Sequence, residues 1–469
     1  MTENANTTMV QEGTSAARAE DVTIGNALLR DRFRVRLRAE MLRIPGSEYR
    51  DYLNGIADPD LESTVLVEIP AYKDPELMPT IRAALAMAAN PDRIHFSICL
   101  QDDDPEKLEA LYAVPHCRVK YYPSDEAPGL CAVRYDCQQL LDGEDFVFHV
   151  DSHMRFAQFW DVAMIGQWWL CGNDKAVVSD CAKAIGPGEL DLPVDDPTFT
   201  EGVDMYCGVL NASFFTHNLP ELRLRVSKLY ESDRPLLGAF ISGHCLFGKA
   251  VMDRTVPSDP KMEFVADEHT VAARLWTHGF DIYHANARCV YHLYNRARRE
   301  DTAYAPPRPE VKVEGGLTRW ERQARRMEKL FGVYDRQDTD LSGFDLGTER
   351  SLADYQAFCG VDFRDLTIGR FAAYGRFDVE HGPEDMEFQD WAKQFEGRES
   401  ELRDTSAKLD LNVRPDAAEE FLRLCAETHV HPQAALTEAV RQATGCAAGF
   451  DLRPAGGPDD SGGCIRSKV

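Results

Sequence analysis

The chain has 469 residues, 44% of them hydrophobic and 10% aromatic, a composition typical of a globular protein with a sizeable core. Its 78 acidic and 52 basic residues give a formal net charge of −26, which argues against nonspecific binding to nucleic acid or to an anionic membrane surface. A phosphate-bearing ligand stays compatible with this charge, because a bound divalent cation reverses the local potential.

The sequence has no sign of a membrane or secretory segment. The first twenty residues are polar and lack the apolar centre of a signal peptide, and no stretch approaches the ~18 apolar residues of a membrane span. The 13 cysteines are scattered, none in a C-x-x-C pair, and several lie in apolar runs, such as Cys99 and Cys289. We therefore expect buried thiols in a reducing compartment, and a soluble, cytoplasmic protein.

The first third of the chain predicts alternating strands and helices. Residues 1–24 are polar and expected to be disordered, and residues 25–59 predict a helical arm. Helices then alternate with strands, which predicts a mostly parallel sheet with right-handed crossovers. The expected strands cover 64–69, 94–100, 119–122 and 146–150, and the expected helices cover 79–88, 105–111 and 128–141.

The middle of the chain is less regular. A loop at 185–203 is of the length that often forms a functional lid, and 236–247 is an apolar, hairpin-like or bent segment broken by glycine. Further helices are expected at 160–170, 269–277 and 319–330, and strands at 176–179 and 281–284.

The composition changes after about residue 370. Residues 383–445 are acidic and predict a small helical appendix with three proline-initiated helices, suited to self-association or to binding a partner. Residues 446–469 are rich in glycine and predict a disordered tail. The catalytic domain is therefore expected within 60–368.

The stretch that most suggests chemistry follows the strand at 146–150. This apolar strand ends abruptly in Asp151, Ser152 and His153. Side chains alternate along a strand, so Asp151 and His153 share a face if the extended path continues. Ligands of open α/β sheets bind at the carboxyl ends of the strands, and a carboxylate with an imidazole suits a divalent cation. The ordinary alternative is that Asp151 caps the next segment and His153 is a surface imidazole.

Several other stretches, in order, complete a recognisable pattern. Together with Asp151-Ser152-His153, the sequence resembles the polypeptide α-N-acetylglucosaminyltransferases, whose best-known members glycosylate hydroxyproline on a cytoplasmic ubiquitin-ligase subunit. The resemblance covers about 60–365 and departs from the family pattern at Asp267, where glycine is usual, and at Ala127-Pro128-Gly129. The segments that carry it are 69–75, 127–134, 143–145, 256–260, 267–268, 273–281, 290–296 and 346–352.

The resemblance implies an α/β domain with the GT-A type glycosyltransferase fold, a retaining mechanism, a UDP-sugar donor, with UDP-GlcNAc as the expected sugar nucleotide, and Mn²⁺ or Mg²⁺. It implies that Asp151, His153 and His292 bind the metal and that Asp267 and Glu268 lie beside the sugar and the acceptor. Arg134 would face the diphosphate. The remaining residues that it places around the nucleotide sugar are Pro70, Ala71, Tyr72, Gln101, Ser152, Ser242, Gly243, Tyr294 and Arg296.

Each of these roles has an ordinary structural alternative. His292 is then a hydrogen-bonded core histidine, Arg134 a surface partner of Asp136 or Glu144, and the acidic pair before 269 a favourable charge at a helix N-terminus. Two other functions also fit the residues: a metal-dependent hydrolase using the aspartate and the two histidines, and a degenerate transferase that serves as a binding scaffold. The acceptor, a hydroxyl group on a protein, a peptide or a small molecule, is left open.

Overall fold

The computed structural model describes residues 63–379, apart from short gaps of which 200–205 and 295–312 are the longest. The chain divides into two units, Met1–Phe215 with Leu219–Glu387, and Thr216–Asn218 with Phe388–Val469. Nearly all described residues belong to the first unit. The expected N-terminal arm, helical appendix and tail lie outside the described residues.

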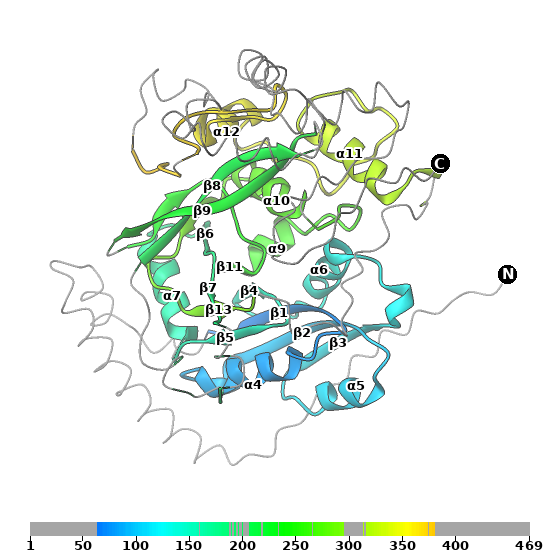
Figure 1. The fold of residues 1–469 in the computed structure, drawn as a ribbon, viewed down its shortest axis with the longest axis vertical. Helices are drawn as coiled ribbons and strands as arrows, with labels where there is room; N and C mark the ends of the chain where they lie inside the picture. The colour runs from blue at the N-terminus through cyan, green and yellow to red at the C-terminus, as the bar shows by residue number, and fades with distance from the viewer. Residues whose placement is uncertain are drawn as a thin grey trace, which may run out of the picture. The chain divides into compact units, whose positions relative to one another are not determined.

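An eight-stranded mixed sheet forms the centre of the first unit (Figure 1). Six strands run in the same direction, and only β10 and β11 are antiparallel to their neighbours. The expected mostly parallel sheet is therefore confirmed. In spatial order the strands are β10 (Leu236–Gly238), β12 (Asp281–His284), β6 (Ala176–Ser179), β11 (Cys245–Lys249), β4 (Phe146–Val150), β1 (Val65–Tyr72), β2 (Ile94–Gln101) and β3 (Cys117–Tyr122).

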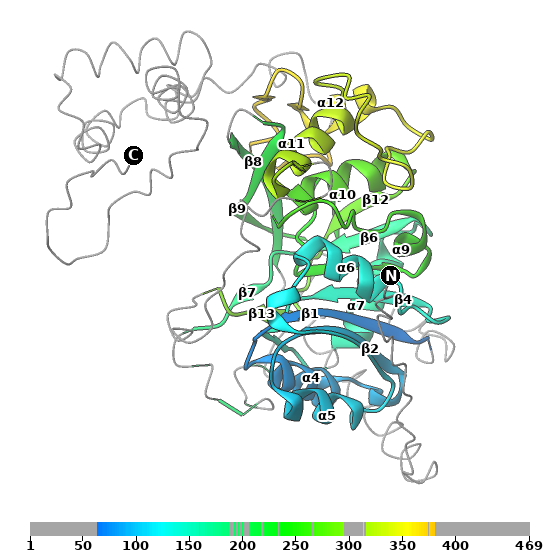
Figure 2. The same ribbon diagram turned by 90° about the vertical axis from the view of Figure 1, so that its right-hand side faces the viewer.

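Helices cover both faces of this sheet, which explains why its central strands are apolar on both sides. Val67 and Ile69 of β1 belong to a core shared with α4 and α7, whereas Leu66 belongs to a core shared with α9 and α10. Figure 2 shows α4 and α5 on one side of β1 and β2, and α6 on the other. The helices are α4 (Leu77–Met87), α5 (Pro105–Tyr112), α6 (Leu130–Gln138), α7 (Trp160–Leu170), α9 (Val251–Thr255) and α10 (Ala266–Thr277).

Strand β1 is longer than the sequence predicts. The expected end at residue 69 is wrong, because the strand continues through Pro70 to Tyr72 and pairs with β2 along its whole length. On its other side β1 pairs with β4 only from Val65 to Glu68. Pro70 therefore lies beyond the last pairing with β4, where its missing N–H costs no hydrogen bond of the ladder.

The two strands in the segment at 236–247 are not neighbours, so of its two expected forms, a hairpin or a bend, the hairpin is wrong. Its strands β10 and β11 lie at separate places in the sheet, with β12 and β6 between them. Two long antiparallel strands, β8 (Tyr206–Thr216) and β9 (Glu221–Glu231), form a separate two-stranded sheet that the sequence did not predict. Leu222, Leu224 and Val226 of β9 alternate with polar residues, so the signal for this strand was present in the sequence and was missed.

A smaller sheet attaches to the edge where β4 ends. It has the order β5-β13-β7, with β13 antiparallel to β5 and parallel to β7. Its strands are β5 (Met154–Phe156), β13 (Val290–His292) and β7 (Lys183–Ala184). Most of the expected loop at 185–203 lies outside the described residues.

The last described segment adds a second core. Phe331 and Phe363 stack with their ring centroids 4.0 Å apart, and Met327 and Tyr355 are buried beside them. Helix α11 begins as predicted and carries a capping box between Thr318 and its third residue. The elements are α11 (Arg319–Leu330), α12 (Leu352–Cys359), β14 (Val361–Asp362) and β15 (Thr367–Ile368).

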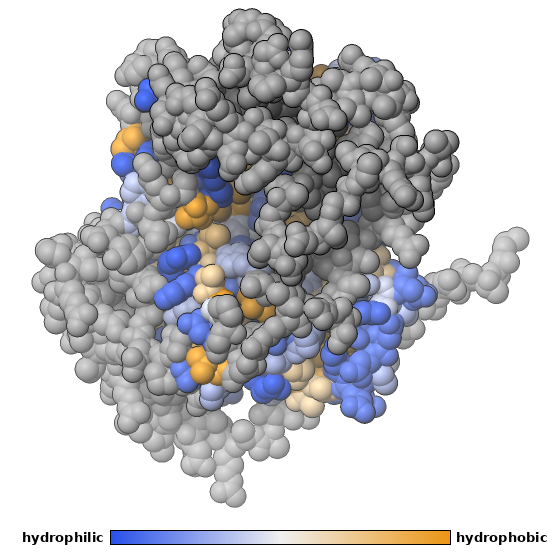
Figure 3. Space-filling model, in the orientation of Figure 1, coloured by the Kyte–Doolittle hydropathy of each residue, from blue (hydrophilic) through white to orange (hydrophobic). Residues whose placement is uncertain are grey.

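The surface of the described part is mixed in polarity. In the view of Figure 3, hydrophilic residues gather over α5, and hydrophobic residues are scattered among polar ones elsewhere. Within the described ranges of 63–379, no helix combines the length and the apolar character that crossing a bilayer requires.

Candidate metal and nucleotide-sugar site

Asp151 lies at the edge of the large sheet where its parallel strands end. It directly follows β4, and Ser152 and His153 lead from it into β5. Strand β11 runs in the opposite direction, with Cys245 opposite Val150, so the residues before β11 reach the same edge. The edge therefore collects side chains from segments far apart in the sequence.

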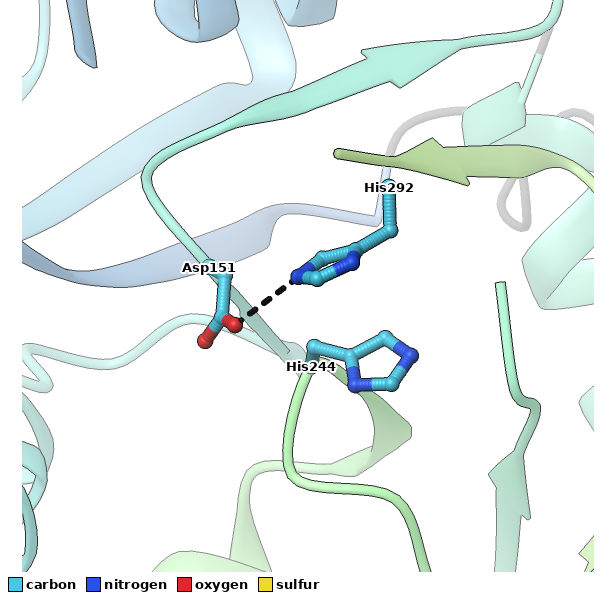
Figure 4. Close-up of side chains that lie close together, drawn as sticks. All are labelled: Asp151, His244 and His292. Atoms are coloured by element: carbon cyan, nitrogen blue, oxygen red, sulfur yellow. Dashed lines mark hydrogen bonds and ion pairs between the residues drawn. The ribbon is translucent and has the colours of Figure 1, made fainter. Parts of the chain in front are cut away.

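His292 is brought to Asp151 by the small sheet. It is the last residue of β13 and lies opposite Met154 of β5. Its Nε2 atom is 3.1 Å from Oδ2 of Asp151 (Figure 4). His292 is buried and hydrogen-bonded to Asp151, which is compatible with a metal ligand and with the alternative of a hydrogen-bonded core histidine.

His244 is the residue that the sequence reasoning missed. Asp151, His244 and His292 each offer one ligand atom, and these atoms lie within 4.8 Å of one another (Figure 4). His244 stands next to the predicted Ser242 and Gly243. Because both of these residues were already expected at the nucleotide sugar, the imidazole beside them could have been recognised as a candidate ligand.

Asp74 holds His153 in position. The Nδ1 atom of His153 lies 2.9 Å from Oδ2 of Asp74, and the hydroxyl group of Ser152 donates to the same oxygen over 2.5 Å. The other ring nitrogen, Nε2, lies 3.7 Å from Oδ2 of Asp151 and has no hydrogen-bond partner among the described residues. A carboxylate behind an imidazole is the usual support of a histidine that binds a metal.

Arg134 joins the two predicted catalytic carboxylates to the metal-site candidates. Its guanidinium donates to Asp267 over 2.6 Å and to the carbonyl oxygen of Gly243 over 2.8 Å, and lies 3.6 Å from Oδ1 of Asp151. Glu268 accepts a hydrogen bond from the backbone N–H of Gly243 over 2.8 Å. Arg134 is therefore part of this buried network and does not form the alternative surface pair.

Gly243 must be glycine for this network to form. A Cβ atom built on it would lie 2.3 Å from a terminal nitrogen of Arg134, which is closer than real Cβ contacts come. The absence of a side chain thus lets the guanidinium pack against the loop backbone.

Ser242 and Tyr294 surround the ring of His244. The hydroxyl oxygen of Ser242 lies 2.9 Å from Nδ1 of His244, and that of Tyr294 lies 3.0 Å from Nε2. The side chain of Tyr294 is 42% exposed, so this part of the site opens to the surface.

The residues predicted beside the uridine lie at the neighbouring strand ends. Tyr72 pairs with Gln101 across β1 and β2, and the amide of Gln101 donates to the carbonyl oxygen of Ala71 over 3.4 Å. Pro70 and Ala71 are buried, and Tyr72 is half-buried. Arg296 lies outside the described residues.

The charges of the site favour an ionised Asp151 beside a neutral His244. Burial opposes ionisation of Asp151, but the hydrogen bond with His292 and the charges of His153 and Arg134 hold its pKa well below the usual value. Burial and the neighbouring His292 lower the pKa of His244 to about 3. Burial raises the pKa of Glu268, against the hydrogen bond from Gly243.

These residues fit a divalent cation. Neutral imidazoles and a carboxylate are suitable ligands for Mn²⁺ and related ions, and Nε2 of His153 is held by Asp74 in the orientation that binding requires. Asp151, His244 and His292 would hold such an ion, whereas the predicted ligand His153 lies beside this group, with its Nε2 atom 3.7 Å from Oδ2 of Asp151. The set of donor atoms is therefore chemically suited to it.

The fold is an α/β domain on a mostly parallel sheet, and comparison with known proteins supplies the family. The model of the glycosyltransferase (GlcNAc) family matches residues 104–365, more than half of the chain. The chain belongs to this family. The expected fold class, a GT-A type α/β domain on a mostly parallel sheet, is thereby confirmed.

Two solved structures are similar to this chain at low identity. GalNAc-T7, solved with UDP, GalNAc and Mn²⁺, is 12% identical with a TM-score of 0.44, over 66% of this chain and 59% of that chain. TarS from S. aureus, residues 1–349, is 13% identical with a TM-score of 0.31, over 49% of this chain and 60% of that chain. The chain thus spans less than two thirds of either neighbour. No curated protein matches the sequence.

Proposed function

We propose that the chain transfers N-acetylglucosamine from UDP-GlcNAc to a hydroxyl group of a protein or peptide, with retention at the anomeric carbon and with Mn²⁺ or Mg²⁺. Membership in the glycosyltransferase (GlcNAc) family supports the reaction class. The resemblance to polypeptide α-N-acetylglucosaminyltransferases supports the finer choice of donor, acceptor and stereochemistry.

One observation carries the proposal. The carboxylate of Asp151 and the imidazoles of His244 and His292 come from three different segments and place their ligand atoms within 4.8 Å of one another. His153 adds a fourth candidate ligand, backed by Asp74. Three imidazoles around one partly buried carboxylate are costly to assemble for packing alone, because removing polar groups from water without a ligand loses their hydration.

A divalent cation stabilises the negative charge that grows on the departing diphosphate. The protein contributes fixed groups around that charge. Asp267 and Gly243 hold the guanidinium of Arg134 near Asp151, so its positive charge is preorganised at this edge. Glu268, held by the loop N–H of Gly243, orients the acceptor hydroxyl group or stabilises the positive charge on the anomeric carbon.

The pathway needs no enzymatic nucleophile. In a retaining transfer without one, the departing phosphate oxygen takes the proton from the acceptor hydroxyl group on the same face of the sugar. The bond from the anomeric carbon to the phosphate oxygen breaks, and the bond to the acceptor oxygen forms. Asp267 is occupied by its 2.6 Å hydrogen bond with Arg134, which suits it to positioning.

The experiment is a panel of UDP-sugars incubated with the full chain and Mn²⁺, scored for release of UDP. We expect UDP-GlcNAc to give the fastest release, and release to fall at least about 100-fold in Asp151→Asn, since the ligand charge is lost. Asp92→Asn, at an exposed carboxylate, is the matched control. Peptides containing hydroxyproline, serine or threonine then test the acceptor by mass spectrometry.

Other outcomes decide between the functions. A tightly held zinc ion without affinity for UDP would indicate a metal-dependent hydrolase. The absence of UDP release with every sugar and every metal would indicate a binding scaffold. Release of UDP from another sugar nucleotide would keep the transferase and replace the donor.

A further inference from the structure

A second group of metal-binding side chains lies inside the sheet, apart from the site at Asp151. Glu68 of β1 and His149 of β4 are directly opposite each other in the register of the two strands. Asp253 of α9 reaches them from the helix that covers this face. All three are buried, with exposed fractions of 2%, 6% and 3%, and their ligand atoms lie within 4.8 Å of one another.

The distances within this cluster match those between ligands of one metal ion. Nε2 of His149 lies 2.9 Å and 3.0 Å from the two carboxylate oxygens of Asp253 and 3.4 Å from Oε2 of Glu68. Ligands at ~2.0–2.2 Å from a common zinc ion are separated by roughly 3.0–3.5 Å. With Asp253 bidentate, three residues supply the four donor atoms that a four-coordinate ion takes.

The cluster also has an unused acceptor. The second oxygen of Glu68, Oε1, is buried and has no hydrogen-bond partner among the described residues. An unpartnered carboxylate oxygen in a dry interior costs free energy unless a proton or a cation binds there.

A further residue fixes the carboxylate from outside. The side-chain amide of Gln138 donates to Oδ1 of Asp253 over 3.0 Å, and its oxygen accepts from the backbone N–H of Ser258 over 2.8 Å. Both ends of the amide are thus engaged, and its orientation is set. Outer hydrogen bonds of this kind orient the ligands of metal sites.

We propose that Glu68, His149 and Asp253 bind a divalent transition-metal ion, with Zn²⁺ as the ion that one imidazole and two carboxylates suit best. The ion would balance the two carboxylate charges and would join α9 to the paired strands β1 and β4. The inference does not rest on the proposed function, because none of the three residues belongs to the site at Asp151.

The test measures bound metal in the full chain, first removing the other candidate ion. A background variant carries Asp151→Asn and His292→Gln. To it is added either Glu68→Gln or, as a matched control, Glu109→Gln at an exposed glutamate. Each protein is equilibrated with Zn²⁺ alone, and its metal content and affinity are measured by mass spectrometry of the metal and by calorimetry.

We expect the background and the Glu109→Gln proteins to hold one Zn²⁺ ion per chain, and Glu68→Gln to bind it at least about tenfold more weakly. Equal Zn²⁺ affinity of the Glu68→Gln and Glu109→Gln proteins would overturn the proposal. If Glu68→Gln does not fold, the proposal is tested on the background variant by the effect of a chelator on its melting temperature. A melting temperature that falls on dialysis against a chelator and recovers with Zn²⁺ supports the site, and one that ignores both treatments refutes it.

Discussion

At the scale of single residues, the candidate site depends on carboxylates that act through other groups. Asp74 reaches His153, Asp267 reaches Arg134, and neither needs to touch a substrate to matter. Such supporting groups fix the tautomer, the ring orientation and the position of the residues in front of them. Substituting such a supporting residue should weaken the site, whereas substituting a ligand should abolish it.

Asp74→Asn tests this support. The uncharged amide would weaken the hold on His153, and we expect the Mn²⁺ concentration for half-maximal UDP release to rise about 10- to 100-fold. At saturating Mn²⁺ much of the activity should return, because the candidate metal ligands themselves are unchanged. A titration of UDP release against Mn²⁺ measures both effects, with Asp92→Asn as control. An unchanged metal dependence would remove Asp74 from the site.

Glu268→Gln tests the second proposed role. The amide retains the size of the side chain and an acceptor for the N–H of Gly243, but loses the negative charge. We expect transfer to the acceptor to fall by about 100-fold or more, while UDP binding, followed by calorimetry, stays within a few-fold of the natural protein. Glu263→Gln, at a half-buried glutamate before the same helix, is the matched control. Full transfer activity in Glu268→Gln would contradict the role.

Asp180 gives a prediction of pH-dependent stability. Burial raises its pKa to about 7, even though Arg288 lies 3.5 Å away. In the unfolded chain its pKa is about 3.9. Its neutral form therefore contributes stability that is complete below about pH 4, and this contribution is lost as the pH rises towards 7, where the folded carboxyl also ionises.

Asp180→Asn should remove this dependence. Between about pH 4 and 7, the free energy of unfolding of the natural protein should fall relative to the variant by at most about 4 kcal/mol. Urea denaturation at several pH values measures the difference, and the other titrating groups cancel because both proteins share them. Parallel curves for the two proteins would show that Asp180 is ionised throughout.

At the scale of elements, the ends of helices and strands decide where the chain can turn. Helix α12 ends at Gly360, whose φ of 66° is left-handed and whose N–H donates to the carbonyl oxygen of Gln356. A Cβ atom there would lie 2.5 Å from the ring of Phe371. The turn thus requires glycine for its backbone and also for its packing.

A pair of substitutions separates these two requirements. Gly332 has the same φ of 66° but no atom within 4 Å of the position of a Cβ. We expect Gly332→Ala to lose about 1–2 kcal/mol of stability from the backbone alone. Gly360→Ala should lose more, since Phe371 must also move. Chemical denaturation of both variants gives the comparison. Equal losses of unfolding free energy would mean that Phe371 moves aside without cost.

At the scale of the whole molecule, the large negative charge has to coexist with the negatively charged donor of the proposed reaction. The formal charge of −26 repels a diphosphate at long range. A cation and the guanidinium of Arg134 reverse this potential locally. We therefore expect the protein to bind the nucleotide much more tightly in the presence of the metal ion than in its absence.

A thermal shift measures this dependence. UDP with Mn²⁺ at about 100 times its dissociation constant should stabilise the protein by about 2.7 kcal/mol and raise the melting temperature by several degrees. UDP without metal, or either ligand with Asp151→Asn, should give a much smaller shift. Asp92→Asn should behave as the natural protein. An equal shift by UDP with and without metal would separate nucleotide binding from the proposed ion.

Much of the architecture could be read from the sequence, because local patterns reflect local physics. The apolar run before Asp151, the prolines at helix starts and the alternation of strands and helices predicted β4, α5, α7, β6 and α11 within a few residues. The same reasoning missed β8 and β9, although these consecutive strands pair with each other and β9 alternates apolar and polar residues. It also ended β1 at Pro70, since only the pairing with β4 shows where a missing N–H is harmless.

The sequence alone also determined the residue types available for chemistry at Asp151, His153 and His292. The tertiary structure decided which of them meet. It brought His244 beside His292, because antiparallel β11 begins at the edge where β4 ends. It likewise set Glu68 opposite His149. Such neighbours depend on strand order and register, which arise from the packing of the whole sheet and which no short stretch of sequence contains.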